Sequence, residues 1–82
     1  MKNEQELLER ITIDPQVMTG KPIIRGLRIS VAQILSALAG GITEKEILDE
    51  YPELEPEDIH AALLYARHRV DEERIFPLSS AK

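Results

Sequence analysis

Short extended runs broken by proline and glycine, followed abruptly by helical periodicity, are the feature that most constrains how this chain folds. Residues 11–31 carry three breakpoints, at Pro15, at Gly20 to Pro22 and at Gly26, between short runs rich in β-branched side chains. Runs of this length are not stable as an isolated hairpin. We therefore expect a β-element over residues 11–29 that packs on helices or pairs with a second copy of the chain.

A first main helix is predicted directly after the β-element, over residues 31–39. Ser30 is a favourable N-cap, and Gly40-Gly41 supplies the glycine that helices prefer in a left-handed terminus. Between them, apolar residues recur at i, i+3, i+4 and i+7, which is typical of a half-buried helix. These residues are Val31, Ile34, Leu35 and Leu38.

Two further helices are predicted, over residues 44–51 and 56–72. Thr43 and Glu46 have the spacing of a capping box for the first of them, and Pro52 stops it. The second has a proline at its first position and acids in its first turn, both of which favour a helix start. Its predicted buried stripe consists of Ile59, Ala62, Leu63, Ala66 and Val70.

The two ends of the chain differ from the domain between them. Asn3 and Glu6 also have capping-box spacing, so residues 1–10 form an N-terminal extension that is either a short helix or a frayed end. Residues 11–74 form the single domain, and residues 75–82 form a C-terminal tail. The fold class is therefore mainly α: a three-helix, helix-turn-helix-like bundle with a short N-terminal β-element.

Charge is distributed unevenly along the chain. The net charge is −5, yet residues 15–43 carry three bases and no acid, whereas residues 44–82 carry five bases and eleven acids. An acidic chain is poorly steered toward nucleic acid overall, but a local basic patch can still contact phosphates. This division favours a binding protein with two different faces.

Size and composition exclude several classes. A chain of 82 residues without cysteine has neither disulfides nor thiolate metal sites, and its core is marginal alone, so we expect a homodimer. No apolar run approaches the roughly 20 residues that span a bilayer. We expect a cytoplasmic protein that does not enter a membrane.

Catalytic chemistry has little support. His60 and His68 lie eight residues apart and do not share a helix face as a metal-binding i, i+4 pair would. No phosphate-binding glycine motif and no nucleophile motif is present. We expect no enzymatic activity, no cofactor, no metal and no small-molecule substrate.

Five cations are the candidate DNA-binding residues. They are Lys21, Arg25, Arg28, Arg67 and Arg69. The start of the last helix, where a recognition helix normally reads the major groove, carries Glu55, Glu57 and Asp58, which would repel phosphates. We therefore expect DNA contact through the β-element. The alternative is that Arg25 and Arg28 pair with the acidic helices of the same chain or a dimer mate.

A short apolar segment near the C-terminus is the candidate partner-binding site. It consists of Ile75, Phe76 and Leu78 around a proline. An exposed apolar segment marks an interaction site. The alternative is that this segment folds back over the core of its own bundle.

A series of motifs runs through most of the chain, at residues 11–15, 20–26, 28–31, 41–43, 47–52 and 54–59. In order and spacing these motifs closely resemble the prokaryotic family called domain of unknown function 433, from about Arg10 to Arg67. The chain departs from the family pattern at Leu27, where the family usually has threonine, and at Glu55, where it often has a threonine cap.

The resemblance implies a homeodomain-like tri-helical fold and a VapB-like role as the antitoxin of a toxin–antitoxin pair. The implied partner is a PIN-like ribonuclease toxin, which the protein would bind and neutralise. The basic β-element would contact operator DNA and autoregulate the operon. Two alternatives stay open: a stand-alone DNA-binding transcriptional regulator, and a protein–protein adaptor without nucleic acid.

Overall fold

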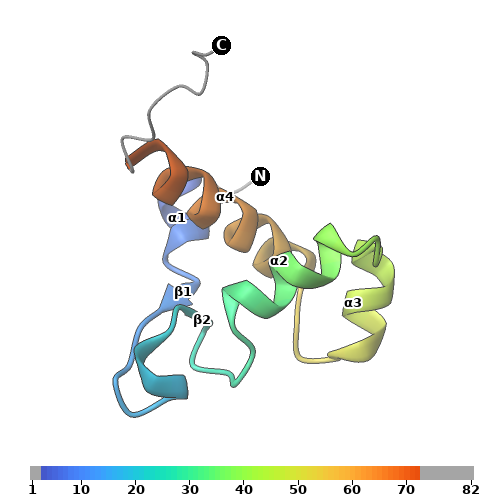
Figure 1. Ribbon diagram of the computed structural model, residues 1–82, viewed down its shortest axis with the longest axis horizontal. Helices are drawn as coiled ribbons and strands as arrows, with labels where there is room; N and C mark the ends of the chain where they lie inside the picture. Colours follow the sequence, from blue (N-terminus) through green and yellow to red (C-terminus); the bar gives the residue numbers. More distant parts are fainter. Residues whose placement is uncertain (1–2, 73–82) are drawn as a thin grey trace.

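The structure is a computed structural model that describes residues 3–72, and this part of the chain is mainly helical (Figure 1). It holds four α-helices, a short 3₁₀ turn and one small antiparallel sheet. In chain order the elements are α1 (Glu4–Leu8), β1 (Ile11–Thr12), η1 (Met18–Gly20), β2 (Ile23–Ile24), α2 (Val31–Ala39), α3 (Glu44–Glu50) and α4 (Pro56–Glu72). None of these helices is both long and apolar enough to cross a membrane.

Capping boxes fix where three of the helices begin. The pairs Asn3 with Glu6 and Thr43 with Glu46 both form capping boxes, and the N-terminal extension holds a short helix over Glu4–Leu8. A third box, not predicted, starts α2: the Ser30 hydroxyl accepts from the Gln33 amide at 3.0 Å, and Gln33 Oε1 accepts from the Ser30 amide at 2.7 Å. Each box satisfies backbone donors that the first helical turn would otherwise leave unpaired.

The helix ends follow from the residues beyond them. Gly41 has a φ of +94°, and the amides of Gly41 and Ile42 donate to the carbonyls of Leu38 and Ala37, as in a Schellman motif. The prediction that the next helix runs to Tyr51 is wrong by one residue. Tyr51 precedes a proline and has a φ of −121° and a ψ of 86°, so α3 ends at Glu50.

The β-element pairs within one chain. β1 and β2 are antiparallel, with Ile11 opposite Ile24, and Ile23 forms a further bridge to Ser30. A tight turn follows β2, in which Arg25 and Gly26 both have positive φ, +45° and +76°. The Leu27 amide donates to the Ile24 carbonyl at 2.7 Å across this turn. Two consecutive positive φ values are typical of a type I′ turn.

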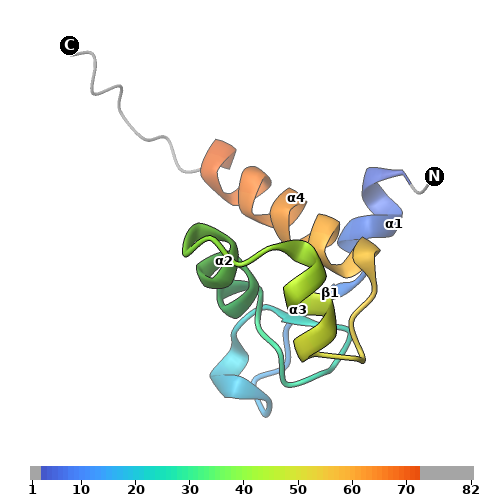
Figure 2. The same cartoon turned by 90° about the vertical axis from the view of Figure 1, so that its right-hand side faces the viewer.

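The core lies where β2, α2, α3 and the first half of α4 meet. Figure 2 shows α4 running diagonally above α2 and α3, and α1 also packs against α4. The buried residues of this core are Ile24, Ile29, Val31, Ile34, Ile47, Leu54, Ile59 and Ala62.

The predicted stripe of α4 is only partly correct. Ile59 and Ala62 are buried, but Leu63 is 43% exposed and Val70 is 57% exposed. Successive helix residues differ by about 100° in direction. With Ala61 and Ala62 facing the core, Leu63 therefore turns toward solvent. Val70 belongs to the second half of α4, which extends past the core.

Candidate functional site

A fully buried carboxylate near the start of α4 joins that helix to the β-element. Asp58 is 0% exposed, and its Oδ1 accepts from Arg25 Nε at 3.0 Å while its Oδ2 accepts from Arg25 Nη2 at 2.9 Å. Arg10 Nη1 donates to Asp58 Oδ1 at 2.9 Å and to Glu55 Oε1 at 2.8 Å. The Glu55 amide donates to Asp58 Oδ2 at 2.8 Å. We call these residues, Arg10, Arg25, Glu55 and Asp58, the arginine clamp.

The contacts of the clamp favour the charged forms of Asp58, Arg10 and Arg25. Burial acts to raise the pKa of Asp58, but hydrogen bonds from Arg25, the Glu55 amide and Arg10 outweigh it and hold this pKa below its usual value. Hydrogen bonds to Glu55 and Asp58 raise the pKa of Arg10, and the hydrogen bond to Asp58 raises the pKa of Arg25. A buried carboxylate with two guanidinium partners is a well-compensated charge and not a proton donor or acceptor poised for chemistry.

Arg25 thus has the structural role that was left open as the alternative to DNA binding. Its Nη2 also donates to the Glu53 carbonyl at 2.8 Å. Sequence reasoning did not identify Arg10 or the buried state of Asp58. A signal for Asp58 was present, because a carboxylate at the third helical position can accept from the N-cap amide, as half of a capping box. Nothing local to Arg10 indicated its pairing.

The other basic candidates lie on several surfaces. Lys21 and Arg28 are exposed in the β-element. Arg67 lies 3.6 Å from Glu4 and 3.8 Å from Asp71, and Arg69 lies 3.7 Å from Glu72. Lys21 and Arg69 line one groove, whereas Arg67 lines a different hollow between α1 and α4. The five predicted residues therefore do not form a single basic patch.

Acidic side chains cover α3 and the loop that leads to α4. Between residues 44 and 57 there are seven carboxylates and a single cation, Lys45, which pairs with Asp49 at 3.0 Å. Six of the carboxylates are exposed and that of Glu57 is half-buried. We call this surface the acidic face; its exposed members are Glu44, Glu46, Asp49, Glu50, Glu53 and Glu55.

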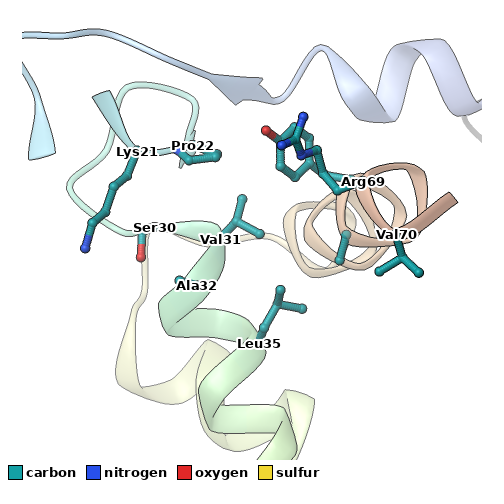
Figure 3. A pocket seen from close by; sticks show the side chains of 10 residues that line it. Lys21, Pro22, Ser30, Val31, Ala32, Leu35, Arg69 and Val70 are labelled. Carbon is teal, nitrogen blue, oxygen red and sulfur yellow. The ribbon is translucent and has the colours of Figure 1, made fainter. Parts of the chain in front are cut away.

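An apolar groove of about 440 Å³ runs between the start of α2 and the second half of α4 (Figure 3). We call it the α2–α4 groove. Lys21 and Arg69 stand on its sides. The remaining lining residues are Pro22, Ser30, Val31, Ala32, Leu35, Tyr65, Ala66 and Val70.

Ile75, Phe76 and Leu78, the predicted partner-binding segment, lie outside the described residues. Within residues 3–72, no three His, Asp or Glu side chains are grouped so that they could hold a metal ion.

Comparison with known proteins identifies relatives of this fold. Residues 11–66 match the family described as "Protein of unknown function (DUF433)". A crystal structure of a DUF433 member protein from Anabaena variabilis ATCC 29413 is similar, with a TM-score of 0.73 and 36% identity, over 82% of this chain and 66% of that one.

A curated relative is similar in sequence. The uncharacterized protein y4eO of Sinorhizobium fredii (strain NBRC 101917 / NGR234) is 33% identical over 58 residues. The match covers 71% of this chain and 26% of y4eO, so the chain spans about a quarter of that relative's length.

Proposed function

The chain belongs to the DUF433 family of proteins of unknown function, and we propose that this member is an antitoxin-like protein. It binds a PIN-like ribonuclease toxin stoichiometrically and neutralises it, and it performs no catalysis itself. In this proposal α2, α3 and α4 serve as a helix-turn-helix-like bundle, and the protein acts as a homodimer in the cytoplasm. A VapB-like role is what the family resemblance implies.

The acidic face is the observation that carries the proposal. This face has seven carboxylates, six of them exposed, and one lysine. Such a negative surface repels nucleic acid and attracts a basic protein surface that binds nucleic acid. A ribonuclease must present such a basic surface to its substrate. An acidic protein surface that covers it would compete directly with RNA.

The arginine clamp supports the same division of roles. Arg10 and Arg25 both direct their guanidinium groups to the buried Asp58, and Arg10 also pairs with Glu55 of the acidic face. Asp49 pairs with Lys45, so among the described residues Glu44, Glu46, Glu50 and Glu53 have no ion-pair partner, and the face keeps a negative potential toward solvent. Charge complementarity of this kind acts mainly on the rate of association and on partner choice.

DNA contact is the second part of the proposal, and the exposed side chains of Lys21 and Arg28 favour it. Both belong to the β-element, which lies on the chain before the acidic helices. The start of α4 offers no comparable surface, because Glu55 and Glu57 stand there and Asp58 is buried. A stand-alone regulator and an adaptor without nucleic acid remain the competing functions.

The test is purification of the tagged full chain from its native host, with and without nuclease treatment. We expect a small protein partner in stoichiometric amount that survives nuclease treatment and degrades RNA once separated. The double variant Glu50→Lys/Glu53→Lys should lose this partner. Asp71→Lys/Glu72→Lys, which makes the same charge change at the C-terminal end of α4 and outside the acidic face, should retain it.

Two results would overturn the proposal. One is a partner without activity on RNA, which would favour the adaptor. The other is recovery only of species that nuclease treatment removes, which would favour the stand-alone regulator.

A further inference from the structure

The α2–α4 groove has apolar walls and a cationic edge. Figure 3 shows Val31 and Leu35 on one wall and Val70 on the other, with Lys21 and Arg69 at the sides. Val70 is 57% exposed although it is a large aliphatic residue in the last turn of α4. An apolar side chain left at the edge of a preformed groove marks a surface that a partner can cover.

The apolar surface continues beyond this groove. A second hollow on the other side of Tyr65 and Arg69 is lined by Leu8, Ile11 and Ile13. Ile13 is 59% exposed. His68 and Glu72 also line this second hollow, and Tyr65 and Arg69 border both hollows, so exposed apolar side chains recur from α2 across α4 to the end of β1. Single exposed aliphatic residues are common on protein surfaces, but here several exposed apolar side chains lie near one another.

The charges of the groove indicate the charge of its occupant. Within residues 3–72, Arg69 pairs only with Glu72, at 3.7 Å and with both side chains largely exposed, and no carboxylate pairs with Lys21. An exposed pair of this kind contributes little and is readily exchanged. Two cations beside an apolar groove, in a chain of net charge −5, therefore suit a partner with carboxylates at the edges of an apolar stripe.

Two other possible occupants of the groove, a second copy of the chain and residues 73–82 of the same chain, fit the charges of the groove less well. A symmetric contact between two copies would bring the same face together, and so Lys21 and Arg69 of both copies would lie near one another. Residues 73–82 of this chain carry one glutamate, one arginine and one lysine, so they do not supply an acidic complement.

The composition of the walls indicates the conformation of the occupant. Apart from Lys21, Ser30 and Arg69 the lining side chains are apolar or aromatic, and the Ser30 hydroxyl already accepts a bond from the Gln33 amide. An extended peptide would bury backbone N–H and C=O groups here without partners. A helix satisfies those groups internally and presents only side chains.

We propose that the α2–α4 groove binds an amphipathic helix of a partner protein. The helix inserts aliphatic side chains spaced i, i+3 or i+4, and i+7, and it places Asp or Glu at its edges against Lys21 and Arg69. This interaction does not depend on the activity of the partner, so it goes beyond the antitoxin function proposed above.

The experiment is a titration of the ¹⁵N-labelled full chain at low salt with two synthetic helical peptides of about 18 residues. Both carry leucine along one face; one has glutamate at the flanking positions and its twin has lysine. We expect the amide shifts to concentrate at Val31, Leu35 and Val70, with the glutamate peptide binding about three- to tenfold tighter. Lys21→Glu/Arg69→Glu should reverse this preference.

Val70→Glu should weaken binding of the glutamate peptide more than tenfold, because it adds a carboxylate inside the groove. Leu63→Glu is the matched control, since Leu63 lies on the same helix at 43% exposure but outside this groove. Circular dichroism should show both variants folded, as both positions face solvent. Equal effects of the two substitutions would refute the site.

Three other results would also overturn the proposal. Equal affinity of the two peptides would remove the role of the cations. Conversion of a dimer to a monomer by Val70→Glu in sedimentation equilibrium would identify a second copy as the occupant. If the substitution Phe76→Ser shifted the amide signals of Val31 and Leu35 in the absence of any peptide, the occupant of the groove would be the chain's own C-terminal segment.

Discussion

One guanidinium, that of Arg25, holds both oxygens of the buried Asp58 carboxylate, with Nε donating to Oδ1 at 3.0 Å and Nη2 to Oδ2 at 2.9 Å. The backbone of Arg25 has a φ of +45°, a conformation that residues with a side chain rarely adopt. The pair therefore ties a left-handed turn after β2 to the first turn of α4. The geometry of the turn and the position of the helix depend on each other.

Arg25→Ala should lower the free energy of unfolding by about 1–3 kcal/mol, because it leaves a buried charge with fewer partners. Arg10 and the Glu55 amide still donate to Asp58, so the loss should fall short of that for an isolated buried ion pair. Arg25→Lys should have an intermediate effect, since an ammonium cannot donate in the same bidentate manner. Urea denaturation measures each change.

The matched control is Arg28→Ala, three residues along the chain and exposed, for which we expect a change within about 0.5 kcal/mol. Equal effects of Arg25→Ala and Arg28→Ala would show that the clamp contributes nothing to stability. The different roles of Arg25 and Arg28 also affect the choice of variants for DNA-binding assays. An Arg25/Arg28 double alanine variant would confuse loss of contact with loss of fold, so single changes at Lys21 and Arg28 are preferable.

The elements that the sequence predicts well are those specified by neighbouring residues. α2 begins at Val31, directly after Ser30, and α4 begins at Pro56, at the positions that the N-cap and the proline start indicate. These signals act within four residues of each helix terminus, so they need no knowledge of tertiary contacts. The same is true of the Gly41 terminus and of the capping box at Thr43.

The clamp and the groove could not be predicted in this way. Asp58 contacts Arg25 across 33 positions of sequence and Arg10 across 48. Lys21 and Arg69 likewise line one groove only because α4 crosses the start of α2. Local periodicity also predicted that Leu63 is buried, but its side chain is 43% exposed. Which face of α4 is buried depends on the elements that pack against this helix, and local periodicity does not contain that information.

Asp58→Asn should make the protein less sensitive to acid. The pKa of Asp58 is lowered in the folded state, against about 3.9 in the unfolded chain, so its contribution is present above that value and is lost as the pH falls through the folded pKa. The difference in unfolding free energy between the wild type and Asp58→Asn should therefore be largest near pH 7 and shrink below about pH 4. Urea denaturation at several pH values measures it.

Asp49→Asn provides the control for the acid response. Asp49 pairs with Lys45 at 3.0 Å, but the two side chains are 67% and 84% exposed, so we expect little change at any pH. If the difference for Asp58→Asn stayed constant from neutral to acidic pH, ionisation of Asp58 would not be what stabilises the clamp.

Gly41→Ala should lower the free energy of unfolding by about 1–2 kcal/mol, because Gly41 has a φ of +94°. A Cβ at this position would meet no atom within 4 Å, so the cost comes from the backbone conformation alone. Asparagine tolerates positive φ better, and Gly41→Asn should therefore lose less than Gly41→Ala. Thermal unfolding compares them. A larger loss for asparagine would contradict a purely conformational cause.

Arg28→Ala should weaken binding to the DNA upstream of the protein's own gene, if the β-element contacts phosphates as proposed. Removing one phosphate contact should lower the affinity at low salt and reduce the slope of log K against log salt by about 1. Arg67→Ala should do neither, because Arg67 lies between Glu4 and Asp71 at 3.6 and 3.8 Å, away from the β-element. Fluorescence anisotropy at several salt concentrations distinguishes the two variants. A reduced slope for Arg67→Ala with an unchanged slope for Arg28→Ala would instead assign DNA contact to α4, and would favour the stand-alone regulator over the antitoxin.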